Sequence, residues 1–156
     1  MMWFEDVEVG AKTDLGTYTF TAEEIIAFAK KYDPQSFHLS EEGGEASVFG
    51  GLIASGWHTV SVWMKLMVAS TKLDARKGDP PRSRVSPGFE ALRWVMPVRP
   101  GMTLSYTTQT IEKVGLKSRP ELGLVKGLNE ARDETGALVM SFIGKGFMPR
   151  KPKGEG

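Results

Sequence analysis

The sequence predicts an α+β domain in which a curved antiparallel sheet wraps around one long central helix. Three observations lead to this prediction. A strongly apolar segment of helical length occupies residues 56–71, four strand-like segments follow it with short turns between them, and one strand and one helix precede it. A helix that is apolar on nearly all sides belongs in a core, so we expect the four strands to cover it.

Length and composition indicate one ordinary globular domain. The chain has 156 residues, of which 40% are hydrophobic and 25% are charged. This length suits a single domain, which we place at residues 1–148, followed by a flexible basic tail at residues 149–156. Twenty Lys and Arg residues stand against nineteen Asp and Glu residues, which gives a net charge of +1. A nucleic-acid partner is therefore not expected.

The chain contains no cysteine, which excludes disulfide bonds, cysteine zinc sites and thiol nucleophiles. Its first residues show neither the basic region nor the apolar stretch of a secretory signal. Glycine and polar residues interrupt the apolar stretch between Glu45 and Lys72, which argues against a membrane span. We therefore expect a cytoplasmic protein with no membrane partner.

The first predicted elements are a strand at residues 13–20 and a helix that follows it directly. The strand is rich in Thr and aromatic residues. Thr21 and Glu24 have the spacing of a capping box, which marks the beginning of a helix. Pro34 disfavours helical geometry at the residue before it, so we expect this helix to end near Tyr32.

After an irregular stretch from Asp33 to Ser55, the apolar helix is predicted from Gly56 to about Thr71. The four predicted strands that follow are Gly88–Met96, Met102–Val114, Leu122–Ala131 and Leu138–Phe147. Residues 77–84 are expected to form an exposed loop before the first of them. Because the turns between the strands are short, we expect antiparallel pairing in sequence order. Such a small sheet leaves one face partly bare, and dimerisation would cover it.

Asp33 and His38 are the first candidates for chemistry. They lie five residues apart across a proline-constrained segment, so both side chains can face one cavity. A carboxylate and an imidazole together can take a proton from water and donate another. Each residue alone more often has a structural role, and the spacing alone favours that explanation. A metal site is not expected, because no third ligand follows at a recognisable spacing.

The glycine-rich segment at residues 49–56 is the second candidate. It leads into the apolar helix, whose first N–H groups have no intrahelical acceptor and favour a developing oxyanion. A phosphate-binding loop is the alternative interpretation of this segment, but the lysine and the glycine spacing of such a loop are missing. Simple packing remains a further alternative. Gly56, with Ser55 and Trp57 beside it, is the candidate for oxyanion and substrate binding, whereas His58 is expected to pack or cap.

Two segments together resemble the hydratase signature of MaoC-like dehydratases, a family that includes the (R)-specific enoyl-CoA hydratases. They are Phe28-Ala-x-x-Tyr-Asp-Pro-Gln-Ser-Phe-His38 and Phe49-Gly-Gly-Leu-Ile-Ala-Ser-Gly56. The resemblance implies the hotdog fold, an Asp33 and His38 catalytic dyad, the Gly56 N–H as oxyanion donor, and a homodimer or a larger homo-oligomer built from dimers. The chain differs from the common pattern in having Ser36 where proline is usual, and Met64 where some members have a supporting serine.

The implied reaction is hydration of a 2-enoyl thioester or dehydration of a 3-hydroxyacyl thioester, with acyl-CoA as the expected substrate. The resemblance implies no cofactor beyond coenzyme A, which is part of the substrate. Two alternatives stay open. A hotdog acyl-CoA thioesterase would need a base on the central helix, but residues 56–70 contain no Asp or Glu. A non-catalytic acyl-thioester-binding subunit is the other alternative.

Overall fold

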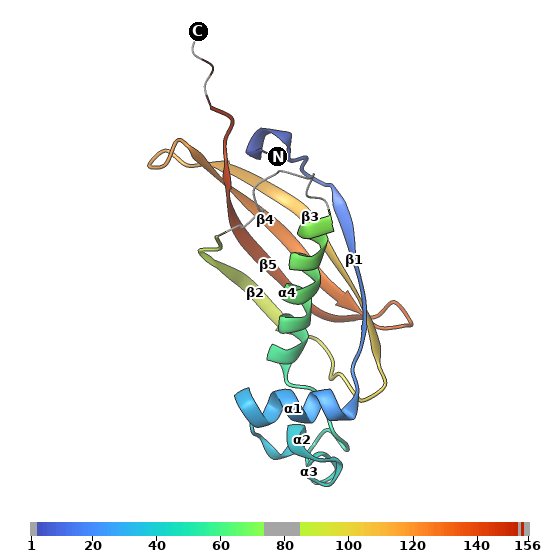
Figure 1. Ribbon diagram of the computed structural model, residues 1–156. Coiled ribbons are helices and arrows are strands. Elements are labelled where there is room, and N and C mark those ends of the chain that lie inside the picture. Colours follow the sequence, from blue (N-terminus) through green and yellow to red (C-terminus); the bar gives the residue numbers. More distant parts are fainter. Residues whose placement is uncertain (1–2, 74–84, 153, 155–156) are drawn as a thin grey trace.

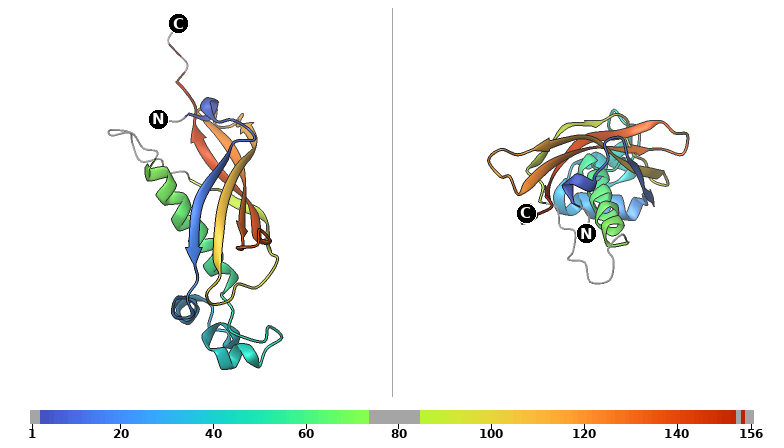
Figure 2. Two further views of the ribbon diagram at one scale, coloured as in Figure 1. Left: turned by 90° about the vertical axis from the view of Figure 1, so that its right-hand side faces the viewer. Right: turned by 90° about the horizontal axis from the view of Figure 1, so that it is seen from above.

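A five-stranded antiparallel sheet curves over one side of a long helix, α4, at Gly56–Leu73 (Figures 1 and 2). The computed structural model describes residues 3–73, 85–152 and 154, so the loop predicted at residues 77–84 lies outside the described residues. The other elements, in chain order, are η1 (Phe4–Asp6), β1 (Lys12–Thr19), α1 (Ala22–Tyr32), α2 (Ser36–Leu39), α3 (Glu41–Glu45), β2 (Gly88–Trp94), β3 (Thr103–Gly115), β4 (Leu122–Arg132) and β5 (Leu138–Pro149). The predicted α+β class is confirmed.

The strands lie in the order β1-β3-β4-β5-β2, and every neighbouring pair is antiparallel. The prediction that the four later strands pair in sequence order is therefore wrong for β2, which pairs with β5 rather than with β3. The connection from β2 to β3 contains Pro97 and Pro100. Proline has no N–H to donate and fixes its own backbone, which disfavours a tight hairpin and lets β2 take the far edge of the sheet.

Local sequence signals at α1 are confirmed. The Thr21 hydroxyl accepts a hydrogen bond from the Glu24 backbone N–H at 3.2 Å, and the helix ends at Tyr32, before Pro34. The stretch expected to be irregular contains two short helices, α2 and α3. Ser40 caps α3 by accepting from the Gly43 N–H at 2.9 Å. Helices this short cannot display a helical repeat in the sequence, which explains why they were missed.

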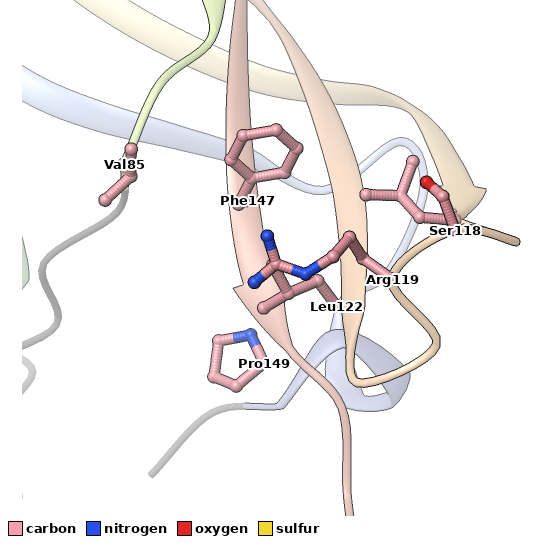
Figure 3. A pocket seen from close by; sticks show the side chains of 7 residues that line it. Val85, Ser118, Arg119, Leu122, Phe147 and Pro149 are labelled. Atoms are coloured by element: carbon pink, nitrogen blue, oxygen red, sulfur yellow. The ribbon is translucent and has the colours of Figure 1, made fainter.

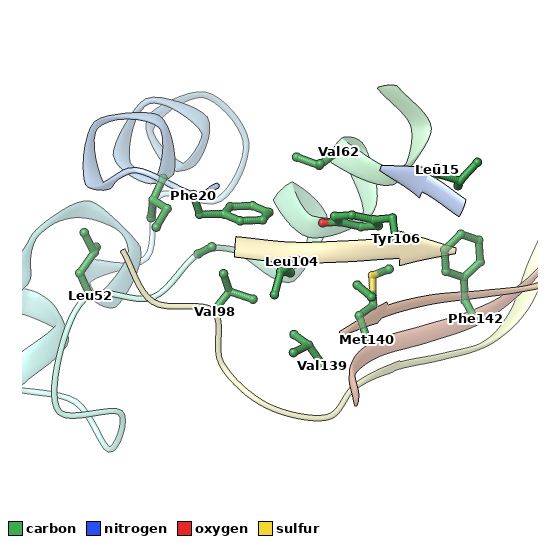
Figure 4. Close-up of a cluster of buried hydrophobic side chains, with 13 residues drawn as sticks. Leu15, Phe20, Leu52, Val62, Val98, Leu104, Tyr106, Val139, Met140 and Phe142 are labelled. Atoms are coloured by element: carbon green, nitrogen blue, oxygen red, sulfur yellow. The ribbon is translucent and has the colours of Figure 1, made fainter. Parts of the chain in front are cut away.

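The inner side of α4 meets the sheet through a continuous apolar cluster (Figure 4). The cluster contains Leu15 from β1, Val62 from α4, Leu104 and Tyr106 from β3, and Met140 and Phe142 from β5. Tyr106 is fully buried, and its hydroxyl donates to the Thr59 carbonyl at 3.0 Å. This bond fixes α4 against the central strands of the sheet.

The outer side of α4 remains open. Trp57, Met64 and Val68 are 48%, 51% and 43% exposed, so the strands of the same chain cover the helix as expected, but from one side only. Five strands form an open sheet, and an open sheet covers a helix from one side only (Figure 2). The apolar residues of the helix therefore form two surfaces. The inner one packs against the sheet, and the outer one is not covered by any other part of the described chain.

The residues that directly follow β5 contact η1 near the other end of the chain. Strand β5 continues to Pro149, and the Arg150 guanidinium lies 2.9 Å from the Glu5 carboxylate. The backbone N–H of Lys151 and the side chain of Arg150 both donate to Glu5 and lower the pKa of its carboxyl to about 2. Flexibility of the tail stays a prediction. None of the helices described here is long and apolar enough to cross a membrane, and the cytoplasmic location also stays a prediction.

His58 lies between two aromatic rings in the first turn of α4. Its imidazole stacks on Phe28 with ring centres 4.7 Å apart, and it meets Phe20 edge-on at 5.0 Å. The side chain is buried, in agreement with the packing role expected from the sequence. Burial lowers the pKa of His58 below its ordinary value of 6.5, and the charge of Glu24 offsets only part of this effect.

We predict that the free energy of unfolding falls as the pH decreases below 6.5, the ordinary pKa of histidine. Stability rises with pH wherever the unfolded chain binds more protons than the folded chain. The neutral form of His58 therefore contributes fully above this pH, and its contribution is lost as the pH falls toward the lower pKa of the folded state. Urea unfolding at several values between about pH 5 and 8 measures the effect.

The His58→Phe variant is the control, because it keeps an aromatic ring in the stack and removes the titrating group. Its free energy of unfolding should depend less on pH over this range than that of the wild type. Equal dependence in both proteins would show that His58 does not carry the effect.

Candidate functional site

Helices α1, α2 and α3 gather at one end of the sheet, beside the amino end of α4 (Figure 1). Asp33 is the residue that ends α1, and its N–H donates to the Ala29 carbonyl at 2.9 Å. His38 lies on α2, which is held to the segment before α4 by a hydrogen bond from the Ile53 N–H to the Phe37 carbonyl at 3.1 Å. Three separate parts of the chain thus meet at this end.

Asp33 and His38 face each other directly. The Nε2 atom of His38 lies 3.3 Å from Oδ2 of Asp33. The other ring nitrogen, Nδ1, lies 2.7 Å from the Ile53 carbonyl oxygen. A carbonyl oxygen can only accept, so Nδ1 carries a proton and donates it. In neutral His38 the lone pair is therefore on Nε2, the atom that faces the carboxylate.

Both oxygens of the Asp33 carboxylate accept further hydrogen bonds. The Ser55 hydroxyl donates to Oδ2 at 2.7 Å, and the Gln35 side-chain amide donates to Oδ1 at 2.7 Å. Burial raises the pKa of Asp33, but these two hydrogen bonds and the charge of His38 outweigh it and hold the pKa below its ordinary value. Asp33 is therefore a carboxylate at neutral pH.

The cluster lies at the start of α4. Ser55 is fully buried, and its carbonyl accepts from the His58 N–H at 2.9 Å, which makes it the residue that precedes the first turn. Gly56 begins the helix, so its N–H belongs to the group that has no intrahelical acceptor. The hydrogen bond from the Ser55 hydroxyl thus links the Asp33 carboxylate to the residue that directly precedes Gly56.

Gly56 is pressed against an aromatic ring. A Cβ atom built on this residue would lie 2.3 Å from Cε2 of Trp94, a distance at which the ring must move. Trp57 is half exposed and meets Trp94 and Phe89 edge-on, at 5.4 Å and 6.5 Å between ring centres. The structure therefore brings Asp33, His38 and Ser55 together beside Gly56, whereas the Trp57 side chain belongs to an aromatic group that includes strand β2. The chemical roles of these residues stay predictions.

Two partners of the pair were not found from the sequence. Gln35 lies two residues after Asp33, which is close enough to suggest a local hydrogen bond. The Ile53 carbonyl is a backbone group and has no signal in the sequence, since any residue would provide it. The bond to Ile53 becomes visible only when α2 and the segment before α4 are placed side by side.

Two hollows lie elsewhere on the molecule. One, of about 500 Å³, lies at the opposite end of the sheet and is lined by Val85, Leu116, Ser118, Arg119, Leu122, Phe147 and Pro149 (Figure 3). The other, of about 570 Å³, lies between the loop before β3 and the turn at residues 133–135. Neither is lined by Asp33 or His38. The pair instead lies where the Asp33 side chain is 19% exposed, so water can reach it.

Comparison with protein families finds a MaoC like domain over residues 6–131. This range includes Asp33, His38, Ser55 and Gly56. A curated relative, the uncharacterized protein YdeM of Bacillus subtilis (strain 168), is 30% identical over 67 residues, which are 43% of this chain and 48% of YdeM. The match thus spans about half the length of that relative.

Solved structures match nearly the whole chain. The MaoC-like dehydratase from Rhodospirillum rubrum is similar with a TM-score of 0.84 and 34% identity, over 98% of this chain and 100% of that chain. An (R)-hydratase from A. caviae shares the fold, with a TM-score of 0.71 and 21% identity, over 93% of this chain and 99% of that chain.

We predict that Gly56→Ala destabilises the protein by about 1–3 kcal/mol, because the added methyl group overpacks the site against Trp94. Denaturant unfolding measures the loss. In a Trp94→Ala background the same substitution should cost less, since the ring that opposes the methyl group is gone. An equal cost in both backgrounds would mean that contact with Trp94 is not why this position holds glycine.

Proposed function

The chain belongs to the MaoC-like domain family, and on this premise we propose that it hydrates 2-enoyl thioesters, or dehydrates 3-hydroxyacyl thioesters, with acyl-CoA as the substrate. The family resemblance and the hotdog fold predicted from the sequence are both confirmed. The observation that carries the proposal is the contact between Asp33 and His38 beside the amino end of α4. These residues supply a proton-transfer pair and a site for negative charge in one place.

The pair is suited to holding a water molecule. With Asp33 ionised and His38 neutral, Oδ2 and Nε2 are two hydrogen-bond acceptors 3.3 Å apart. A water that donates one hydrogen to each relieves their repulsion, and its lone pairs then point away from both. The oxygen of this water bonds to the β-carbon of the enoyl group, the pair takes one proton from the water, and the pair then passes that proton to the α-carbon, so that one water is added across the double bond. Acid–base assistance of this kind contributes about 10²–10⁴-fold to a rate.

The start of α4 is suited to the thioester oxygen. Negative charge develops on this oxygen when water adds to the conjugated double bond, and the Gly56 N–H donates to it. The positive end of the helix dipole, equivalent to about half an elementary charge, acts in the same direction. One such donor is worth about 10²–10³-fold. The proposed reaction needs no cofactor other than the coenzyme A of the substrate, and takes place in the cytoplasm.

The two alternatives predict different chemistry at the same site. A thioesterase needs a base directed at a water near the thioester carbon, but α4 contains no Asp or Glu to provide it. A non-catalytic binding subunit needs no proton-transfer pair, yet Asp33 and His38 are held in contact by Gln35, Ser55 and Ile53. These contacts favour hydration over both alternatives.

A second copy of the chain is the proposed partner. The outer side of α4 and the edge strand β2 together expose large apolar side chains, which are Trp57, Met64, Val68, Phe89 and Trp94. The aromatic members of this face contact one another directly above Gly56. Neither of the two hollows described above is lined by the pair, and an acyl pocket completed by a second copy at this face fits the proposed substrate. We therefore propose a homodimer, or a larger assembly built from it.

We predict that Asp33→Asn and His38→Gln each lower the hydration rate of crotonyl-CoA by roughly 10²–10⁴-fold, because each removes one half of the proton-transfer pair. Loss of the enoyl-thioester absorbance measures hydration. Both variants should keep the unfolding midpoint close to that of the wild type. Undiminished turnover in either variant would remove that residue from the mechanism, and release of free thiol by the wild type would point to the thioesterase.

We predict that Met64→Glu splits the dimer. An unpaired charge buried in an interface costs about 3–5 kcal/mol, which is roughly 10²-fold or more in the dissociation constant. Sedimentation analysis measures the mass in solution, and hydration should fall together with it. Val9→Glu is the matched control, since Val9 is 59% exposed and lies in the turn before β1. A monomeric wild type, or a Met64→Glu dimer with full activity, would contradict the proposed interface.

A further inference from the structure

The Asp33 carboxylate is held by two neutral side chains that the proposed mechanism does not use. Ser55 donates its hydroxyl to Oδ2, the oxygen that also faces His38, and Gln35 donates its amide to Oδ1. Both distances are 2.7 Å, which is ordinary for the O–H···O bond from Ser55 and short for the N–H···O bond from Gln35. The two hydrogen bonds therefore fix the position of the carboxylate and its rotation about the Cβ–Cγ bond of Asp33.

Ser55 is itself fixed by the beginning of α4. Its carbonyl accepts from the N–H groups of His58 and Thr59, at 2.9 Å and 3.4 Å, and the residue is fully buried. The backbone of Ser55 therefore cannot move without disturbing the first turn of the helix, and its hydroxyl is held by the bond to Asp33. Through this one residue the carboxylate is placed relative to Gly56, which follows Ser55 in the chain.

Gln35 is fixed by the two residues that it lies between. Its N–H donates to the Asp33 carbonyl at 2.8 Å, and its own carbonyl accepts from the His38 N–H at 2.9 Å. Its side chain is exposed, so water can take over part of its role if it is removed. Ser55 is buried and has no such replacement. The two donors thus act on the same carboxylate, but water can replace only the exposed one, so we expect the loss of Ser55 to have the larger effect.

We propose that Ser55 and Gln35 are positioning residues, which hold the Asp33 carboxylate against Nε2 of His38 and beside the amino end of α4. Neither residue needs to touch the substrate. This reassigns Ser55, which the sequence analysis placed among the substrate-binding candidates. The expected effect of these two residues on the reaction rate rests on the proposed hydration, whereas their effect on the position and pKa of the Asp33 carboxylate does not.

The two hydrogen bonds also stabilise the charged form of the carboxylate. A donor to an ionised carboxylate lowers its pKa, and burial works in the opposite direction. Removing the Ser55 hydroxyl leaves the burial in place and takes away one of the bonds that oppose it. The pKa of Asp33 should therefore rise, and the acid limb of the pH–rate profile should move to higher pH with it.

The test compares Ser55→Ala, Gln35→Ala and a matched control, Ser40→Ala. Ser40 caps the nearby helix α3, and the hydrogen bonds found among the described residues do not join it to Asp33. Carbon-13 NMR follows the Asp33 carboxyl through a pH titration in each full-length protein. We expect the Asp33 pKa to rise clearly in Ser55→Ala, to rise less in Gln35→Ala, and to stay at the wild-type value in Ser40→Ala.

The same variants are then assayed with crotonyl-CoA. For Ser55→Ala we expect kcat to fall by roughly 10²-fold, because a displaced catalytic group loses about that much. KM should change little, and the acid limb should shift to higher pH. If Ser55 only stabilised the fold, its loss would lower the amount of folded enzyme but would leave the acid limb of the pH–rate profile where it is.

An unchanged Asp33 titration in both Ser55→Ala and Gln35→Ala overturns the proposal. If Ser55→Ala does not fold, the exposed Gln35 still provides the test, since its replacement leaves the core intact. A shifted titration in proteins that hydrate no enoyl thioester, wild type included, supports the positioning role and rejects the proposed function. The two failures are therefore distinguishable.

Discussion

The hydrogen bond from the Ser55 hydroxyl to the Asp33 carboxylate joins the end of α1 to the beginning of α4. Everything at the candidate site depends on this junction. It sets the distance from the carboxylate to the first N–H groups of the helix, and it places Oδ2 where His38 can meet it. A bond to an ionised group in a buried setting is stronger than a bond between neutral groups. A single buried hydroxyl can therefore determine the geometry of a site formed by distant parts of the chain.

Close backbone contacts and aromatic stacking support the same junction. A Cβ atom on Gly44 would lie 2.1 Å from the Gly51 carbonyl carbon, so only glycine lets α3 approach the segment before α4. The stack of His58 on Phe28 then fixes α1 across the first turn of α4. The His58 imidazole also lowers the stability of the fold, because its Nδ1 is buried without a hydrogen-bond partner among the described residues. The site thus lies on a rigid base whose stability depends on pH.

The open side of α4 connects the fold with the proposed assembly. The sheet buries the inner side of the helix, whereas the outer side leaves several large apolar side chains exposed. Burying each of them in an interface would stabilise the assembly by about 1.5–3 kcal/mol. This face begins beside Gly56, where Trp57 and Trp94 meet. An interface at this face would therefore both stabilise the chain and enclose the substrate, which links activity to assembly.

The local elements and the residues with suitable chemistry could be predicted from the sequence alone. Neighbouring residues predict the cap at Thr21, the stop before Pro34, the apolar helix and the strand segments. The choice of Asp33 and His38 as a catalytic pair rested instead on the resemblance to a family signature, because their spacing alone favours a structural role. Pairing of β2 with β5, the open side of α4, and the bonds from Ser55 and Ile53 were decided by the tertiary structure. These join residues far apart in the chain, or involve backbone groups that every residue has. A pattern of side chains along the sequence holds no record of such contacts, because they exist only once the core has brought the segments together.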